Sequence, residues 1–260
     1  MQDARREILT QVAAGTLTPT EAATRLDEVE REHTQAPGRR QTPIAGADIR
    51  GVRVSSNFGR IIVLGDASVD QATADGPHVA RHEDGIFVIE TDENFDGDFW
   101  FGRRDGGRWW NSFRGPTVTV RMNPRLEAWI NADAGSVTIR DVLAPIHAEV
   151  QAGSLVVQGF VRPLDLATSA GSIRAEGSLR DGSSRIRCEM GSVRIALASD
   201  SDVRVGAKTS VGSVNFDNGG ENRARGRRSW GERQEVVYGS GTASLEVESE
   251  MGSVTVSRSR

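Results

Sequence analysis

The sequence contains little lysine or cysteine. Of its 32 lysine and arginine residues only Lys208 is a lysine, and the formal net charge is −4. Because a net negative chain is a poor ligand for a phosphate backbone, we expect no nucleic-acid partner. Cys188 is the single cysteine, which excludes an internal disulfide framework.

Long apolar runs are also missing. The chain has no stretch of about 18 consecutive apolar residues, and no apolar segment follows its charged start. The sequence therefore predicts neither a membrane span nor a signal peptide. We expect a cytoplasmic protein, with at most peripheral contact to the inner face of an anionic membrane.

The first part of the chain has helical periodicity. Residues 4–13 place small and aliphatic side chains at helical spacing, and Gly15 stands where a helix would stop. A Thr-x-x-Glu capping box from Thr18 to Glu21 begins a second helix. We expect an α-helical hairpin over 1–33, which buries too little apolar surface alone and so docks on the main domain, on a protein partner or on a second copy.

A tether and a repeat domain follow. Residues 34–48 mix Pro, Gly and polar side chains without a period, which predicts a flexible linker. Beyond it a Gly-Ser pair followed by alternating apolar residues recurs, with steps of 18, 18, 20, 21 and 40 residues between successive glycines. These glycines are Gly135, Gly153, Gly171, Gly191, Gly212 and Gly252.

The repeat predicts strands that bend. Side chains two and four residues after each glycine are almost all apolar, as on the buried face of a strand. The residue just before the glycine is predicted to be inward too, as for Ala134 and Ala152. The inward parity then slips by one at each Gly-Ser, which indicates a corner where a residue without Cβ is needed. An earlier unit around Gly59 fits the same register with Phe58 inside.

The predicted fold class is all-β. We expect a β-helix-like β-solenoid over 49–260, built of repeats of about 18 to 21 residues with a Gly-Ser corner. Residues 86–90 and 117–122 are predicted as further strands, and insertions are expected near 91–115 and 217–237.

Three stretches of this sequence together resemble a known family. They are ILTQVAAGTLTPTEAATRLDEVE in the head, the Gly-Ser ladder, and PTVTVRMNPRLEAWINADAGSVTIRDV. The chain is similar to the Toastrack family, also catalogued as a putative-adhesin β-strand-repeat domain of unknown function, and its head resembles the short bihelical modules of the SHOCT type. The resemblance implies a role in bacterial cell-envelope stress systems, beside membrane regulators.

Residues with catalytic or ligating chemistry are scattered. His78 and His82 have a metal-binding spacing for a helix but precede an expected strand. Cys188 aligns with small inward residues, which favours a packed thiol. The acidic run of Glu90, Asp92, Glu93, Asp96 and Asp98 is explained by a solvated loop or by a divalent cation. We expect no catalytic residue, no metal site and no cofactor.

Two segments combine aromatic and basic side chains in a way that suits an interaction surface. The first lies near 95–114 and the second near 219–234. The structural alternative for the first is a hairpin whose rings cover one flank of the solenoid, and for the second it is a solvated loop. Their candidate residues are Trp100, Arg103, Arg104, Arg108, Trp109, Trp110, Arg227, Arg228 and Trp230.

The sequence favours a non-enzymatic scaffold or adaptor that acts through protein contacts or peripheral membrane contacts. One alternative is a self-assembling structural polymer like bactofilin, in which terminal coils stack end to end. A second is a carbohydrate-binding or adhesin-like β-helix, which needs a groove lined by aromatic and carboxylate side chains.

Overall fold

The computed structural model describes residues 49–91, 115–217 and 232–259. By its internal contacts the chain divides into Met1–Arg40 and Gln41–Arg260, and the described residues all belong to the second unit. The hairpin predicted over 1–33 and the linker over 34–48 lie outside them. Within the described ranges the fold is all-β, with no helix able to cross a membrane.

Seven long strands carry a glycine near their middle. They are β1 (Gly51–Gly65), β6 (Glu127–Arg140), β7 (Ile146–Phe160), β8 (Leu164–Gly177), β9 (Ser183–Leu197), β10 (Val203–Asp217) and β12 (Ala243–Arg258). Five shorter strands complete the described part. They are β2 (Ala72–Asp75), β3 (His78–Glu83), β4 (Ile86–Thr91), β5 (Thr117–Met122) and β11 (Glu232–Tyr238).

The long strands form one parallel ladder. They stand in the order β1, β6, β7, β8, β9, β12 and β10, and equivalent residues of neighbouring strands are paired. We call each long strand a rung. The strands predicted over 86–90 and 117–122 are β4 and β5, which pair with the two halves of β1. Antiparallel strands cover the ends: β3 on β4, β2 on β5, and β11 on the first half of β10.

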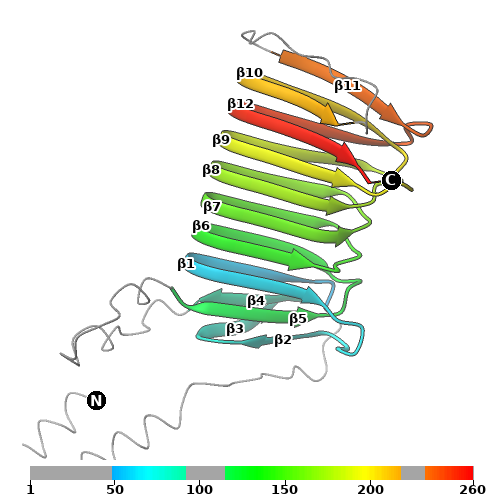
Figure 1. The fold of residues 1–260 in the computed structure, drawn as a ribbon. Coiled ribbons are helices and arrows are strands. Elements are labelled where there is room, and N and C mark those ends of the chain that lie inside the picture. The colour runs from blue at the N-terminus through cyan, green and yellow to red at the C-terminus, as the bar shows by residue number, and fades with distance from the viewer. Residues whose placement is uncertain (1–48, 92–114, 218–231, 260) are drawn as a thin grey trace, which may run out of the picture. The chain divides into compact units, whose positions relative to one another are not determined.

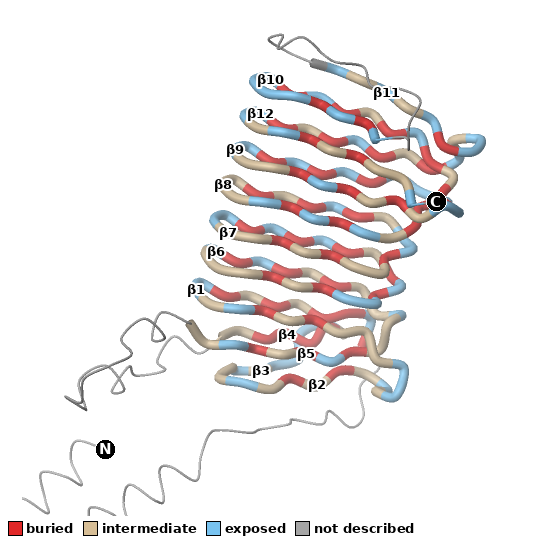
Figure 2. Tube along the Cα trace, in the orientation of Figure 1, coloured by how far each residue is buried: buried red, intermediate tan, exposed pale blue. Residues whose placement is uncertain are grey.

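Each rung bends at its glycine, so that its two halves lie in two layers (Figure 1). In β6 the buried side chains are Ala128, Ile130 and Ala132 in the first half, then Val137 and Ile139 in the second. The same alternation recurs in every rung, and the tube in Figure 2 is coloured as exposed or intermediate where the rungs bend. Apolar side chains of both layers therefore meet in one core between them.

The corner differs from the sequence prediction in one respect. Ala134 is only half-buried and Ala152 is exposed, while Phe58 is 57% exposed, so the residue before the glycine does not point inward. The inward side chains nearest the corner of β6 are Ala132 and Val137. The inward parity does slip by one, as predicted. The bend, however, comprises the four residues 133–136 between Ala132 and Val137, instead of the two residues predicted between Ala134 and Val137.

The last strand of the chain is not the last rung. β12 lies between β9 and β10 and pairs parallel with both, although β10 precedes it in the sequence. The interval of 40 residues between the last two repeat glycines holds β11, which pairs antiparallel with the other side of β10. The segment from β11 to β12 therefore passes around the start of β10.

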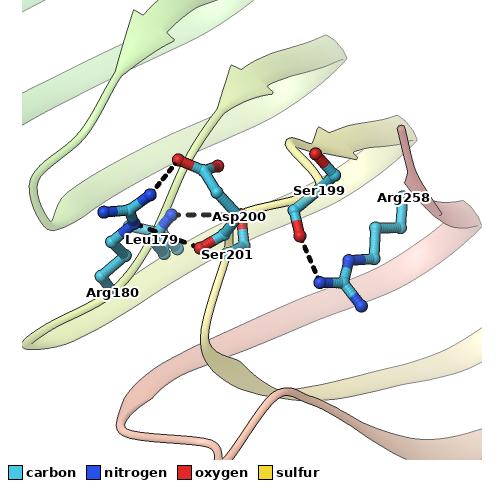
Figure 3. Close-up of polar contacts among 6 residues, drawn as sticks. All are labelled: Leu179, Arg180, Ser199, Asp200, Ser201 and Arg258. Atoms are coloured by element: carbon cyan, nitrogen blue, oxygen red, sulfur yellow. Dashed lines mark hydrogen bonds and ion pairs between the residues drawn. The ribbon is translucent and has the colours of Figure 1, made fainter. Parts of the chain in front are cut away.

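The loop between β9 and β10 spans the place of the inserted rung. Residues 198–202 cross two rung spacings, whereas the equally long loop 178–182 joins adjacent rungs β8 and β9. Figure 3 shows the two loops fastened together. The Leu179 amide donates to Ser201 Oγ at 3.4 Å, and Arg180 donates to the Asp200 carbonyl at 3.1 Å and pairs with its carboxylate. Arg258 at the end of β12 donates to the Ser199 carbonyl.

Asp202 fixes the turn that leads into β12. Its carboxylate accepts hydrogen bonds from Ser240 Oγ at 2.7 Å, Thr242 Oγ1 at 2.9 Å and the Gly241 amide at 2.6 Å. The two hydroxyl groups, first Ser240 and then Thr242, lower the pKa of Asp202 to about 2. The side chain just before β10 thus holds the turn that connects β11 to β12.

Candidate interaction surface

The nine aromatic and basic residues nominated from the sequence, Trp100 to Trp230, lie outside the described ranges. Of the acidic run only Glu90 is described, and Asp92, Glu93, Asp96 and Asp98 lie outside those ranges too. The seven repeat glycines all lie at the bends, and the candidate surface is built around them.

The glycines stack so closely that no other residue fits. Their φ angles run from +130° at Gly59 to +148° at Gly212, a region that side chains with a Cβ rarely adopt. A Cβ on Gly171 would lie 1.8 Å from the carbonyl oxygen of Gly153 in the next rung, and one on Gly191 would lie 1.7 Å from that of Gly171. At the bends the backbones of neighbouring rungs are therefore in direct contact.

This register aligns the residues that precede the glycines. Each is paired with its equivalent in the next rung, and because the bend turns them outward they form one continuous column on the surface. We call this column the corner ridge. It consists of Phe58, Ala134, Ala152, Ala170, Met190, Met251 and Val211, in the order of the rungs.

The corner ridge is apolar and exposed. Phe58, Met190, Met251 and Val211 are 57%, 51%, 50% and 44% exposed. Only eight large hydrophobic side chains among the described residues are exposed to that degree, and half of them lie in this one column. Scattered surface hydrophobics need no explanation, but a contiguous stripe of them indicates a contact surface.

The two flanks of the corner ridge differ in charge. On the side of the first layer the neighbouring column contains Asp133, Glu189 and Glu250 among uncharged residues. On the other side, beyond the bare glycines, six rungs carry a serine and β1 carries Arg60, which donates to Ser136 Oγ at 3.3 Å. One flank is therefore acidic, and the other is mostly neutral and hydroxyl-rich.

Exposed apolar side chains and carboxylates lie side by side at the end of the ridge formed by β9, β12 and β10. Met190, Met251 and Val211 occupy successive rungs there, and Glu189 and Glu250 precede the two methionines. We call these five residues the methionine patch. No ion pair or hydrogen bond joins either glutamate to any described residue, and both carboxylates are exposed on adjacent strands. Like charges directly across a pair of strands destabilise the sheet.

The nucleophilic and ligating candidates do not converge. Cys188 is buried in the core, and its pKa is raised by desolvation and by the neighbouring Glu189 carboxylate. His78 and His82 lie on β3, where His78 Nδ1 is 2.8 Å from the Gly76 carbonyl oxygen and His82 packs on Phe87. Among the described residues no three His, Cys, Asp or Glu side chains are grouped as metal ligands.

The outward face of the first layer carries one aromatic pair. The Trp129 ring is stacked on His147 with 6.2 Å between ring centroids, and His147 Nδ1 lies 4.0 Å from an Asp165 oxygen. A separate hollow of about 140 Å³ lies beside Gly206, between Lys208, Arg233, Glu246 and Glu248. The side chains that line this hollow are mostly charged.

Comparison with known proteins adds little. No protein-family model and no curated protein matches the chain. Among solved structures it is similar to a putative cell adhesion protein from Clostridium sporogenes ATCC 15579, at 13% identity and a TM-score of 0.46 over 82% of this chain and 94% of that one. It is also similar to a putative adhesin from Bacteroides fragilis NCTC 9343, at 12% identity and a TM-score of 0.29 over 82% and 98%. Both TM-scores lie below 0.5, and neither likeness supports an assignment of function.

The corner ridge was not predicted from the sequence, although a signal for it exists. The column before the glycines contains residues as different in size as Ala134, Phe58 and Met190. The column two places earlier, with Ala132, Val150 and Cys188, contains only small side chains and is buried.

Proposed function

We propose that this chain is a non-enzymatic adaptor, built on a β-solenoid, that binds a partner protein along the corner ridge. The observation that carries the proposal is the exposed apolar column Phe58–Ala134–Ala152–Ala170–Met190–Met251–Val211, which the in-register glycines align. The solenoid reading is supported by parallel pairing of equivalent residues in seven rungs. A cytoplasmic place in bacterial envelope-stress signalling, and a SHOCT-like head that engages a protein partner or a second copy, rest on the sequence alone.

Physical chemistry favours a contact role for this column. The four large side chains expose apolar area that the neighbouring rungs leave uncovered. Covering such area is worth about 25 cal/mol per Å². Methionine, which fills irregular shapes through its flexible thioether, is common on surfaces that accept several related partners.

Site-specific photo-crosslinking in the cells that produce the chain tests this proposal. A photoreactive phenylalanine analogue at Phe58, Met190 or Met251 should yield the same covalent adduct with another protein. The same analogue at Leu143 or Val161, which are comparably exposed outside the corner, is the control and should yield none. Equal crosslinking from ridge and control positions, or none from the ridge, would show that the corner ridge is not the contact surface.

A further inference from the structure

The partner's chemistry can be inferred from the flanks of the corner ridge. Resting on the function proposed above, we propose that the occupant of the ridge is an amphipathic α-helix of a partner protein, with apolar side chains on the ridge and lysine or arginine opposite Glu189 and Glu250.

An added β-strand cannot bind along the corner ridge. The strand residues on both sides of each bend already pair with equivalent residues of the neighbouring rungs, as on either side of Met251 in β12. Recognition by strand addition needs an unpaired edge, and the ridge runs across the rungs instead of along an edge. A partner must therefore bind through side chains, as a helix does.

The spacing of the rungs suits a helix. Neighbouring rungs stand about 4.8 Å apart, so seven of them span about 29 Å. An α-helix advances about 5.4 Å per turn and covers 29 Å in roughly 19 residues. One apolar side chain per turn would then meet about one rung. The small residues Ala134, Ala152 and Ala170, beside bare glycines, leave room for the helix to approach closely between Phe58 and Met190.

Charge complementarity favours a helix whose basic side chains lie on the flank that faces Glu189 and Glu250. Glu189 and Glu250 occupy equivalent positions of β9 and β12, between the paired residues Cys188–Ser249 and Met190–Met251. Other outward glutamates nearby have a cation, such as Glu248 with Lys208 at 2.7 Å and Glu246 with Arg185 at 3.5 Å. Two unpaired carboxylates side by side lower the stability of the sheet, and cations on a partner would relieve that repulsion.

Two synthetic peptides test the inference on the full chain. Both are 20-residue helical peptides with leucine at every third or fourth position, one with lysine and the other with glutamate along the flank. Fluorescence anisotropy should detect binding of the lysine peptide, weakened by added salt, and much weaker binding of the glutamate peptide. Equal affinity for the two peptides, or no binding of either, would overturn the inference.

Variants locate the binding to the methionine patch. Glu189→Gln with Glu250→Gln should weaken the lysine peptide about fivefold, reduce its salt dependence and slightly raise the thermal midpoint. Met190→Ser with Met251→Ser should weaken it about tenfold or more without unfolding the chain, since both side chains are exposed. Glu149→Gln with Leu143→Ser, an exposed pair away from the ridge, is the matched control and should change nothing.

Other occupants give different results, and each would overturn the inference. If a second copy covers the ridge, the chain alone sediments as a dimer and Met190→Ser with Met251→Ser makes it monomeric. If the chain's own arginines cover it, Arg227→Ser with Arg228→Ser increases peptide affinity. Ridge crosslinks in cells without any peptide preference would leave the adaptor proposal intact and remove only the basic helix.

Discussion

At the scale of single residues, the bends depend on glycine for two separate reasons. The backbone there has positive φ, and the next rung's carbonyl oxygen occupies the place of a Cβ. The sequence repeat predicted both reasons, a strained backbone and a close approach of adjacent coils, and the φ angles and the stacked glycines confirm them. The repeat could not show which atom of the neighbouring rung fills the place of the Cβ, and in the structure that atom is the carbonyl oxygen of the equivalent glycine.

We expect Gly171→Ala to lower the free energy of unfolding by about 3 kcal/mol or more, because it adds backbone strain and a clash with the Gly153 carbonyl oxygen. Gly206→Ala is the matched control, since a Cβ there meets nothing within 4 Å and the rung gains a residue with less unfolded-state entropy. Its unfolding free energy should stay within about 1 kcal/mol of the parent. Urea denaturation measures both, and equal effects would contradict the stacked bends.

At the scale of elements, the sequence predicted the strands better than their order. The apolar periods over 86–90, 117–122 and the Gly-Ser repeats correspond to described strands, because a period of two reports burial of alternate side chains. The insertion of β12 could not be predicted in this way. The repeats have nearly interchangeable inward columns, so their pattern does not distinguish a place for β12 between β9 and β10 from a place on the far side of β10.

Acid should weaken the anchoring of the turn that connects β11 to β12. Since the pKa of Asp202 is lowered to about 2 in the folded chain and is about 3.9 when unfolded, its stabilising effect is fully present above about pH 4 and is lost as the pH falls towards 2. Asp202→Asn should therefore have a lower urea midpoint than the parent at pH 7, and the gap should close between about pH 4 and pH 2.

The same titration on Asp70→Asn is the control for Asp202→Asn, because within the described ranges the exposed Asp70 carboxylate accepts no hydrogen bond and only its backbone carbonyl does. It should follow the parent throughout. A gap for Asp202→Asn that persists unchanged at pH 2 would mean that the carboxylate charge does not hold the turn.

At the scale of the whole β unit, the strands that cover its ends bear on the alternative that the chain assembles end to end into a polymer. The end strand β3 carries Arg81, His82 and Glu83 and is largely exposed, and β11 covers half of β10 in antiparallel orientation. Charged side chains on an end strand oppose edge-to-edge pairing. The corner crosses every rung and presents four of the eight exposed large hydrophobic side chains among the described residues, whereas the end strands β3 and β11 present only Val79 and Val237. This arrangement favours contact along the corner over stacking of ends.

The order of the rungs determines which residues form the methionine patch, so it is the central structural claim. With β12 inserted, Cys188 is paired with Ser249 and lies two rungs, about 9.6 Å, from Thr209. With rungs in sequence order, Cys188 would adjoin Thr209 instead, and Glu189 would no longer stand beside Glu250. Cysteines bridge only when their Cα atoms are about 4.4–6.8 Å apart.

The most direct measurement is therefore a count of free thiols after mild oxidation and denaturation of two variants that each pair a new cysteine with Cys188. We predict that Ser249→Cys loses both thiols to a disulfide within the chain, and that Thr209→Cys keeps both. The reverse result would place β10 directly beside β9 and would contradict the inserted strand and the paired glutamates built on it.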